Sequence, residues 1–257
     1  ARWRADRWLK LGCHMKALRG LKVLSLGVSL GLFLTACSTT GGNPQANDPY
    51  EQTNRQVFDF DIRLDRHILL PTAQAYNDVV PEFARDGVHN FLLNLNSPVI
   101  FANDVLQGEA GRGGQTLARF VLNSTIGIGG LIDIAGKIGI PYHDEDFGQT
   151  LGVWGAEEGP YLVLPFFGPS NPRDLTGDVV DIAFDPNTYI SYNYKFYWSL
   201  GRGVISVIDL RARNATTLAG IERGSVDYYA SVRSLYRQNR ANEIANGKQD
   251  VNNLPDF

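Results

Sequence analysis

Several short motifs in the sequence resemble parts of catalytic sites. Asp146-Phe147-Gly148 matches the metal-binding tripeptide of protein kinases, but the sequence has no glycine-rich loop and no H-R-D segment to complete that site. Ser170 lies in Gly-Pro-Ser-Asn-Pro, which lacks the second glycine of G-x-S-x-G. His67 and His89 each stand alone in predicted helices. We therefore predict no enzymatic activity.

Two further segments invite a metal or nucleotide interpretation. His143-Asp144-Glu145-Asp146 gathers oxygen atoms that attract a cation, but a solvated acidic loop is the simpler interpretation. Ser124–Pro141 is rich in glycine, yet position 132 is Ile where G-x-G-x-x-G requires glycine, and no strand pattern precedes it. Close helix packing or a bend accounts for these glycines. We expect no metal site and no cofactor.

Cys37 carries the clearest covalent chemistry. The segment Leu34-Thr35-Ala36-Cys37 resembles the bacterial lipobox, in which the cysteine thiol receives a diacylglyceryl group and the new amino group is acylated after cleavage. Residues 15–36 combine basic residues with an apolar run too short to span a bilayer, which is typical of an export signal. Ser38 follows the cysteine where an aspartate would favour the inner membrane, so we expect an outer-membrane anchor on the periplasmic side.

The rest of the chain divides by composition. Residues 1–14 precede Met15 and are expected to be an upstream extension. Residues 37–47 are small, polar and rich in Gly and Pro, which predicts a lipidated tether. Residues 48–247 are expected to form the folded domain, and 248–257 a flexible tail.

Charge excludes one class of partner. Without residues 1–37, the 257-residue chain keeps 17 Lys and Arg against 26 Asp and Glu, a net charge of −9 that disfavours nucleic acid. Cys13 lies in the removed part, so the exported part has no disulfide and no cysteine metal site. Attachment to a membrane must then come from lipid and apolar contacts.

Apolar residues at three-to-four spacing predict a mostly helical domain. Asp48-Pro49-Tyr50-Glu51 places a carboxylate at the N-cap of a helix that should run to about Leu70, where Pro71 would stop it. Pro81 should open a second helix, and Ser97-Pro98 should cap a third. Two more helices are predicted within 204–219 and 225–236, and Gly247 should end the last helix.

Two segments of the domain need a special environment. Gly159–Pro172 carries no charge and has prolines at 160, 165, 169 and 172, which disfavour regular structure. Arg202 lies between two glycines among aromatic and aliphatic residues, where a cation needs a partner or a water-filled cavity. One hypothesis is that Arg202 contacts a phospholipid phosphate; the alternative is that it pairs with an acid such as Asp209 or reaches to solvent.

Several segments together resemble the MlaA (VacJ) family of outer-membrane lipoproteins. They occur in order from Asp48 to Gly247 and include NDPYEQTNRQVFDFD, VPEFARDGVHNFLLNLNSPVIFANDVLQGE, TLARFVLNSTIGIGGLIDIA, DFGQTLGVWGAEEGPYLVLPFFGPSNPRD and YYASVRSLYRQNRANEIANG. The resemblance implies an all-α, ring-like helical bundle with helices lying in the membrane plane and a central amphipathic channel. It also implies that mislocalised outer-leaflet phospholipids pass through this channel to a periplasmic carrier of the Mla system, and that the protein associates with trimeric porins.

The resemblance gives the apolar segment an environment. Irregular backbone at membrane depth is tolerated where its polar groups are buried in protein or line a cavity. The residues expected to face lipid or the channel are Tyr161, Leu162, Phe166 and Phe167, and Arg173 and Asp174 should mark the return to water. The alternative is a loop that crosses the core. Gly127, Gly129 and Gly130 are expected to allow movement at the channel mouth.

Three functions stay open at this point. The first is phospholipid transport that maintains outer-membrane lipid asymmetry, and the second is a porin-associated structural lipoprotein without transport activity. The third is a cryptic phospholipase. Bound phospholipid favours the first, porin binding without lipid the second, and released fatty acid the third.

Overall fold

The computed structural model describes residues 47–246. The chain divides into two units, residues 1–41 and 42–257, and every described residue belongs to the second. The predicted signal peptide, the lipidation site at Cys37, almost all of the tether and the C-terminal tail lie outside the described residues.

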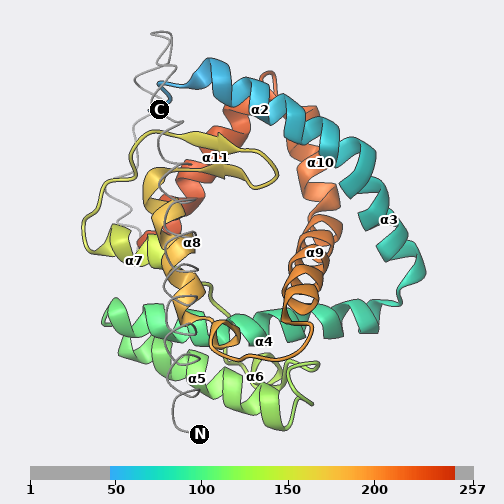
Figure 1. The fold of residues 1–257 in the computed structure, drawn as a ribbon, viewed down its shortest axis with the longest axis vertical. Coiled ribbons are helices and arrows are strands. Elements are labelled where there is room, and N and C mark those ends of the chain that lie inside the picture. Colours follow the sequence, from blue (N-terminus) through green and yellow to red (C-terminus); the bar gives the residue numbers. More distant parts are fainter. Residues whose placement is uncertain (1–46, 247–257) are drawn as a thin grey trace, which may run out of the picture. The chain divides into compact units, whose positions relative to one another are not determined.

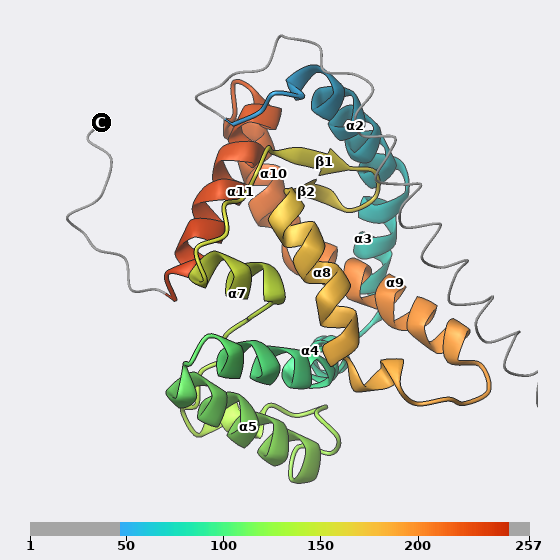
Figure 2. The same cartoon turned by 60° about the vertical axis from the view of Figure 1, so that its left-hand side comes forward.

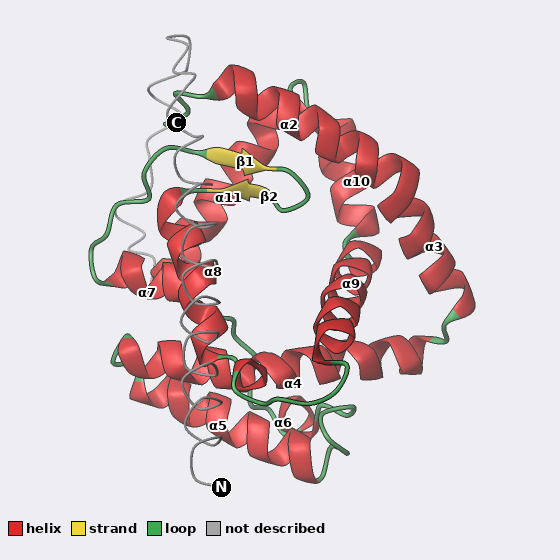
Figure 3. Cartoon of the chain, viewed as in Figure 1, coloured by secondary structure: helices red, strands yellow, loops and turns green. Residues whose placement is uncertain are grey.

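The described residues are mostly helical, with one short hairpin (Figure 3). The elements before the hairpin are α2 (Glu51–Leu64), the π-helix η4 (Asp65–Leu69), α3 (Leu70–Val79), α4 (Glu82–Leu106), α5 (Ala110–Thr125), α6 (Ile134–Lys137) and α7 (Phe147–Val153). The hairpin and the elements after it are β1 (Leu162–Leu164), β2 (Gly168–Ser170), α8 (Pro172–Phe184), the 3-10 turn η5 (Pro186–Thr188), α9 (Lys195–Arg213), α10 (Ala215–Gly224) and α11 (Tyr228–Ile244).

Within this unit the helices follow one another around a closed circuit (Figure 1). From α2 the chain continues through η4 and α3 to α4, which contacts α7 and α8; α7 contacts α11, and the hairpin leads back to α2. Helices α9 and α10 run along the inner side of α3 and α2 in Figure 1. Figure 2 shows α4 and α5 stacked as a separate layer at one end. The all-α, ring-like fold expected from the resemblance is confirmed.

None of the helices described between residues 47 and 246 combines the length and the hydropathy that a membrane span requires.

The first predicted helix is wrong at both ends. It begins at Glu51 after Tyr50, and the Asp48 side chain does not cap it. It does not stop at Pro71, because five residues, Asp65–Leu69, widen into a π-helix in which the Leu70 N–H donates to Asp65 O. In this wider turn the proline ring does not clash with the preceding turn, and the hydrogen bond that proline cannot donate is not needed. The chain therefore continues directly into α3.

The predicted boundary at Ser97-Pro98 is also wrong. Helix α4 runs without interruption from Glu82 to Leu106 with Pro98 inside it. A proline inside a helix costs about 3 kcal/mol, and the contacts that α4 makes with α5, α7, α8 and α9 outweigh that cost. The Ser97 hydroxyl, expected to cap a new helix, donates instead to Leu93 O at 3.4 Å.

The proline-rich segment forms an antiparallel hairpin. Val163 lies opposite Pro169 in a pair without hydrogen bonds across the hairpin, since the Val163 N–H points away from β2, so the ladder needs no N–H from the proline. The free side of β1 is also satisfied, because the Val163 N–H donates to Asn54 Oδ1 at 3.0 Å. The tip turns through Phe166 and Gly168, both with positive φ (71° and 78°).

The apolar core lies where the hairpin meets α2 and α11. Phe58, Tyr161, Val163 and Tyr229 are buried together. The three aromatic rings meet edge to face, at centroid distances of 5.5 Å (Phe58–Tyr229) and 6.1 Å (Tyr161–Tyr229). Edge-to-face contacts of this kind add stability beyond the area buried. This part of the segment lies in the core, as the alternative of a core-crossing loop implies, but it forms a short strand where a loop was expected.

Asp48 has a structural role that the capping interpretation missed. Its side chain is fully buried and accepts hydrogen bonds from Asn54 Nδ2 at 2.8 Å, from Arg233 Nη1 at 2.6 Å and from the Tyr229 hydroxyl. Asn54 also donates to Tyr161 O at 3.0 Å. One carboxylate thus ties the start of the domain to the hairpin and to α11.

The acidic loop was predicted to be solvated, but it is so only in part, because Asp144 is exposed whereas Glu145 is buried. Glu145 is 1% exposed and accepts from Gln107 Nε2 at 2.7 Å and from Arg112, while His143 contacts Asp104 at 3.0 Å. Burial raises the pKa of the Glu145 carboxyl, although Gln107 and Arg112 oppose the rise. The loop therefore joins α7 to α4 and α5 through interior ion pairs.

Arg240 on α11 makes a second junction of the same kind. It donates to Asp146 at 2.7 and 3.0 Å and to Asp174 at 2.9 Å. Burial alone would raise the pKa of Asp174, but hydrogen bonds from Arg240 and Tyr236 outweigh it and hold that pKa below its usual value. Asp174 is buried and does not mark a return to water, as was expected for it and Arg173.

Replacing Asp48 by Asn should lower the free energy of unfolding by about 3 kcal/mol, because it leaves the buried Arg233 cation without its closest counter-charge. Urea unfolding of the purified protein, followed by circular dichroism, measures this change. Asp59→Asn removes an exposed carboxylate from the same end of the domain and should change stability by no more than about 0.5 kcal/mol. Equal effects of the two substitutions would show that the Asp48 junction does not hold the domain together.

Candidate functional site

The described structure has an amphipathic pocket between the hairpin tip and helices from both halves of the chain. We name it the hairpin-tip pocket; its volume is about 290 Å³. Its apolar wall is formed by Phe58, Ile62, Leu64, Leu69, Phe166, Phe167, Pro169, Leu218 and Tyr228. Its charged side chains are Asp61, Asp65, Arg66, Arg211 and Glu222. An apolar cavity with a few convergent charged groups is the usual form of a small-ligand site.

Two aromatic residues at the tip of the hairpin face this pocket and remain largely exposed. Phe166 is 70% exposed and Phe167 is 84% exposed. The Phe166 N–H donates to Asp61 Oδ1 at 2.9 Å, and its ring packs edge to face on Phe60 at 5.5 Å. The tip is therefore fixed to α2 through its backbone, while the Phe167 ring is left uncovered.

Four of the five charged residues of the pocket form two ion pairs. Arg211 donates to Asp65 through Nε at 2.6 Å and through Nη2 at 2.9 Å, and Arg66 pairs with Glu222. The hydrogen bonds to Asp65 raise the pKa of Arg211 above its ordinary value, so this cation stays charged. Asp65 and Arg66 reach the pocket because the π-helix carries them.

Asp61 differs from the other acids of the pocket. Burial raises the pKa of its carboxyl, and the hydrogen bond from the Phe166 N–H only partly offsets this rise. No ion pair joins Asp61 to a cation among the described residues. It is the acid in the pocket whose charge the protein itself compensates least.

The structure brings together only part of the predicted site. Phe166 and Phe167 line the hairpin-tip pocket, and Leu162 is half-buried in β1. Tyr161 is 2% exposed and belongs to the core, so it does not face lipid or a channel. Arg202 lies elsewhere on α9 and pairs with Asp185 at 2.7 Å, not with Asp209.

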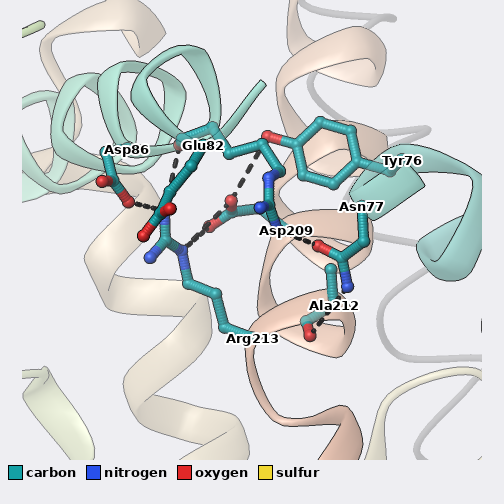
Figure 4. Close-up of a pocket in the computed structure, with 8 residues that line it drawn as sticks. Tyr76, Asn77, Glu82, Asp86, Asp209, Ala212 and Arg213 are labelled. Carbon is teal, nitrogen blue, oxygen red and sulfur yellow. Dashed lines mark hydrogen bonds and ion pairs between the residues drawn. The ribbon is translucent and has the colours of Figure 1, made fainter. Parts of the chain in front are cut away.

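Asp209 belongs to a separate, small cavity of about 100 Å³ (Figure 4). The Asp209 carboxylate contacts His89 Nδ1 at 2.7 Å and Arg213 Nε at 3.1 Å, and Arg213 also reaches Asp86 at 3.0 Å. The Tyr76 hydroxyl donates to Asp209 at 3.4 Å. These hydrogen bonds make the cavity a polar junction of α3, α4 and α9. His89, which stands alone in the sequence, is one of its partners.

The predicted flexible glycines lie in a turn after α5, outside the hairpin-tip pocket. Backbone hydrogen bonds hold this turn, from Gly129 N to Ser124 O at 3.0 Å and from Gly130 N to Asn123 O at 2.8 Å. A Cβ atom on Gly130 would lie 2.6 Å from Asn94 Cβ, and one on Gly127 would overlap backbone oxygens, whereas Gly129 has open space around it. Their role at a channel mouth stays a prediction.

Sequence reasoning missed the charged half of the pocket. Asp61, Asp65 and Arg66 lie within the stretch FDFDIRLDRHILL, where charged and apolar residues alternate too closely for a helix with one wet face. That irregular pattern was the available signal. Arg211 and Glu222 gave no signal of their own, because only the fold places them beside α2.

Comparison with known proteins identifies the family. The family model described as MlaA lipoprotein matches residues 46–243. The chain belongs to the MlaA lipoprotein family. The intermembrane phospholipid transport system lipoproteins MlaA of Shigella flexneri and of Escherichia coli are each 37% identical to it over 232 residues, which cover 88% of this chain and 89% of each relative.

A solved structure supports the same assignment. It comes from work on the structural basis for maintenance of bacterial outer membrane lipid asymmetry. It matches with a TM-score of 0.70 and 37% identity over 77% of this chain and 98% of that chain. The family predicted from the sequence segments is therefore confirmed, together with the helical fold.

The glycine turn gives a graded prediction. Gly129→Ala should cost about 1 kcal/mol, from backbone strain at positive φ alone (69°). Gly130→Ala should cost about 3 kcal/mol, because the same strain is joined by overlap with Asn94. Thermal unfolding of the two variants measures the difference. Equal melting temperatures would contradict the packing of this turn on α4.

Proposed function

We propose that this protein removes mislocalised phospholipids from the outer leaflet of the outer membrane and passes them to a periplasmic carrier, which maintains lipid asymmetry. Membership of the MlaA lipoprotein family supports this proposal, since two relatives bear the name of an intermembrane phospholipid transport system. The observation on which the proposal depends most is the hairpin-tip pocket, because it offers apolar surface and charged groups side by side.

A conduit for phospholipid needs two kinds of surface. Acyl chains are stable against apolar side chains, whereas a headgroup in hydrocarbon loses its hydration and needs polar partners. Phe167, Leu69 and Leu218 supply the first surface, and the Arg211–Asp65 and Arg66–Glu222 pairs supply the second. The barrier to leaving a leaflet falls without any covalent step, so catalysis has no part in the proposal.

Exposed aromatic residues support a position in the membrane plane. The stretch from η5 into α9 presents Tyr189, Tyr194, Phe196, Tyr197 and Trp198, all between 45% and 77% exposed. Aromatic side chains of this kind concentrate at membrane interfaces, and an uncovered cluster of them in water would be costly. We propose that this stretch contacts the bilayer and that the helices around it lie in the membrane plane.

The remaining parts of the proposal concern attachment and partners. Lipid on Cys37 would hold the domain at the outer membrane through the tether, and trimeric porins and the periplasmic carrier of the Mla system are the proposed partners. Whether Arg202 contacts a phosphate stays a prediction; its pairing with Asp185 is compatible with an ordinary structural role. A central amphipathic channel, of which the hairpin-tip pocket would form part, is proposed as the lipid path.

Replacing Phe167 by Asp should abolish transport without unfolding the protein. The side chain is 84% exposed, so the charge disturbs no core, but it lies where acyl chains would pass. Phe83→Asp, at a residue 80% exposed on α4 and outside the pocket, is the matched control. Cells lacking the gene are complemented with each variant, and surface phospholipid is measured with a membrane-impermeant amine label.

The expected result is high surface labelling in the deletion strain and with Phe167→Asp, and low labelling with the wild type and with Phe83→Asp. Undiminished rescue by Phe167→Asp would remove the hairpin-tip pocket from the lipid path. If the deletion strain showed no rise in labelling, a porin-associated structural lipoprotein would replace transport as the function.

A further inference from the structure

Two residues that line the hairpin-tip pocket each carry a buried polar atom without a hydrogen-bond partner among the described residues. The two atoms are Asp61 Oδ2 and Arg211 Nη1. Buried polar atoms are nearly always paired, and leaving one unpaired costs about 1–3 kcal/mol, more when the group is charged. Two such atoms of opposite charge in one pocket call for a ligand that supplies both a donor and an acceptor.

The geometry explains why the protein itself does not satisfy these atoms. Asp61 Oδ1 accepts from the Phe166 N–H, and Oδ2 accepts no hydrogen bond from the described part of the chain. Arg211 uses Nε and Nη2 for the two oxygens of Asp65. Because a guanidinium is a rigid planar fork, the bidentate bond to Asp65 leaves Nη1 directed to another side.

The charge balance of the pocket decides which ligand fits. Its wall holds two guanidinium groups, of Arg66 and Arg211, against three carboxylates, of Asp61, Asp65 and Glu222. Pairing Arg66 with Glu222 and Arg211 with Asp65 leaves the Asp61 charge without a cation. A ligand with net negative charge would add to this excess, whereas a ligand that carries an ammonium group would neutralise it.

The apolar wall restricts the ligand further. Phe167, Leu69 and Leu218 line the same cavity as Asp61 and Arg211, the residues that carry the two unpartnered atoms. A molecule that occupies all of it needs a hydrocarbon part, an acceptor such as phosphate for Arg211, and a cationic donor for Asp61. A phospholipid with an amine headgroup has these three parts in one molecule.

We propose that the hairpin-tip pocket selects phospholipids with a phosphoethanolamine headgroup, whose ammonium donates to Asp61 Oδ2 and whose phosphate accepts from Arg211 Nη1. This inference rests on the proposed transport function and names its preferred substrate. Both atoms are covered in the structure, so a neighbouring side chain must move before a headgroup reaches them. Phe167 is the most exposed residue of the pocket and therefore the side chain with most freedom to move.

The raised pKa of Asp61 agrees with this role. Burial opposes ionisation of the carboxyl, and an ammonium group beside it would lower the pKa again. A carboxyl whose pKa is higher in the folded than in the unfolded protein lowers the stability of the fold as pH rises through that pKa. Asp61 thus costs stability at neutral pH, as residues at functional sites often do.

The test compares lipids retained by the full-length protein in detergent, using native mass spectrometry. The protein is incubated with equimolar phosphatidylethanolamine and phosphatidylglycerol of the same acyl chains, and with N-acetylated phosphatidylethanolamine, which lacks the ammonium charge. The wild type should retain phosphatidylethanolamine about tenfold over each of the other two lipids, which is the size of one charge-assisted hydrogen bond.

The variants isolate the two atoms. Asp61→Asn keeps an acceptor for the Phe166 N–H and should still bind lipid but lose the preference. Arg211→Gln should reduce the retention of all three lipids. Asp59→Asn on the same helix and Arg223→Gln on α10 are matched, exposed controls outside the pocket and should behave as the wild type. Circular dichroism confirms that each variant is folded.

The outcomes separate this inference from the proposed function. Equal retention of the three lipids by the wild type, or an unchanged preference in Asp61→Asn, would overturn headgroup selection alone. Retention of no phospholipid by the wild type would overturn the transport proposal as well. A preference that disappears in Asp61→Asn and survives in Asp59→Asn would establish it.

Discussion

Buried pairs between arginine and carboxylate are the interaction on which the rest of this structure depends. Among the described residues, 17 polar or charged side chains are buried but only nine hydrophobic ones, so polar contacts make up much of the interior of the circuit of helices. The pairs at Asp48, Glu145 and Arg240 each join elements far apart in sequence. Breaking such a pair costs more than the pair contributes, because a charge is left buried. The helices therefore have few alternative arrangements.

The same arrangement explains how a functional pocket can form. Because ionic junctions outside the pocket hold the helices, Phe166 and Phe167 at the hairpin tip can stay exposed and need not pack into the core. The π-helix contributes to the pocket locally, because it accommodates Pro71 and also places Asp65 where it pairs with Arg211. Phe166, at the same pocket, has a positive φ, which strains the backbone of a residue other than glycine.

The sequence predicted the helical class, because apolar spacing is a local signal, and it predicted the family, because several of its segments resemble that family in order. It did not predict the hairpin, since Gly159–Pro172 was expected to be irregular. It failed where tertiary contacts override local rules. Pro98 does not break α4, Asp48 pairs with Arg233 and not with a helix end, and Tyr161 is in the core. The charged half of the pocket depends on Arg211 meeting Asp65, 146 positions away, which no local pattern contains.

The central claim is that a phospholipid occupies the hairpin-tip pocket. Photo-crosslinking tests it most directly, with a phospholipid that carries a diazirine on an acyl chain and is loaded onto the full-length protein before peptide mapping. The account predicts crosslinks concentrated at Phe166 and Phe167 and at Leu69 or Leu218 across the pocket. Crosslinks spread equally over other exposed aromatic residues, such as Phe83, with none across the pocket, would contradict it.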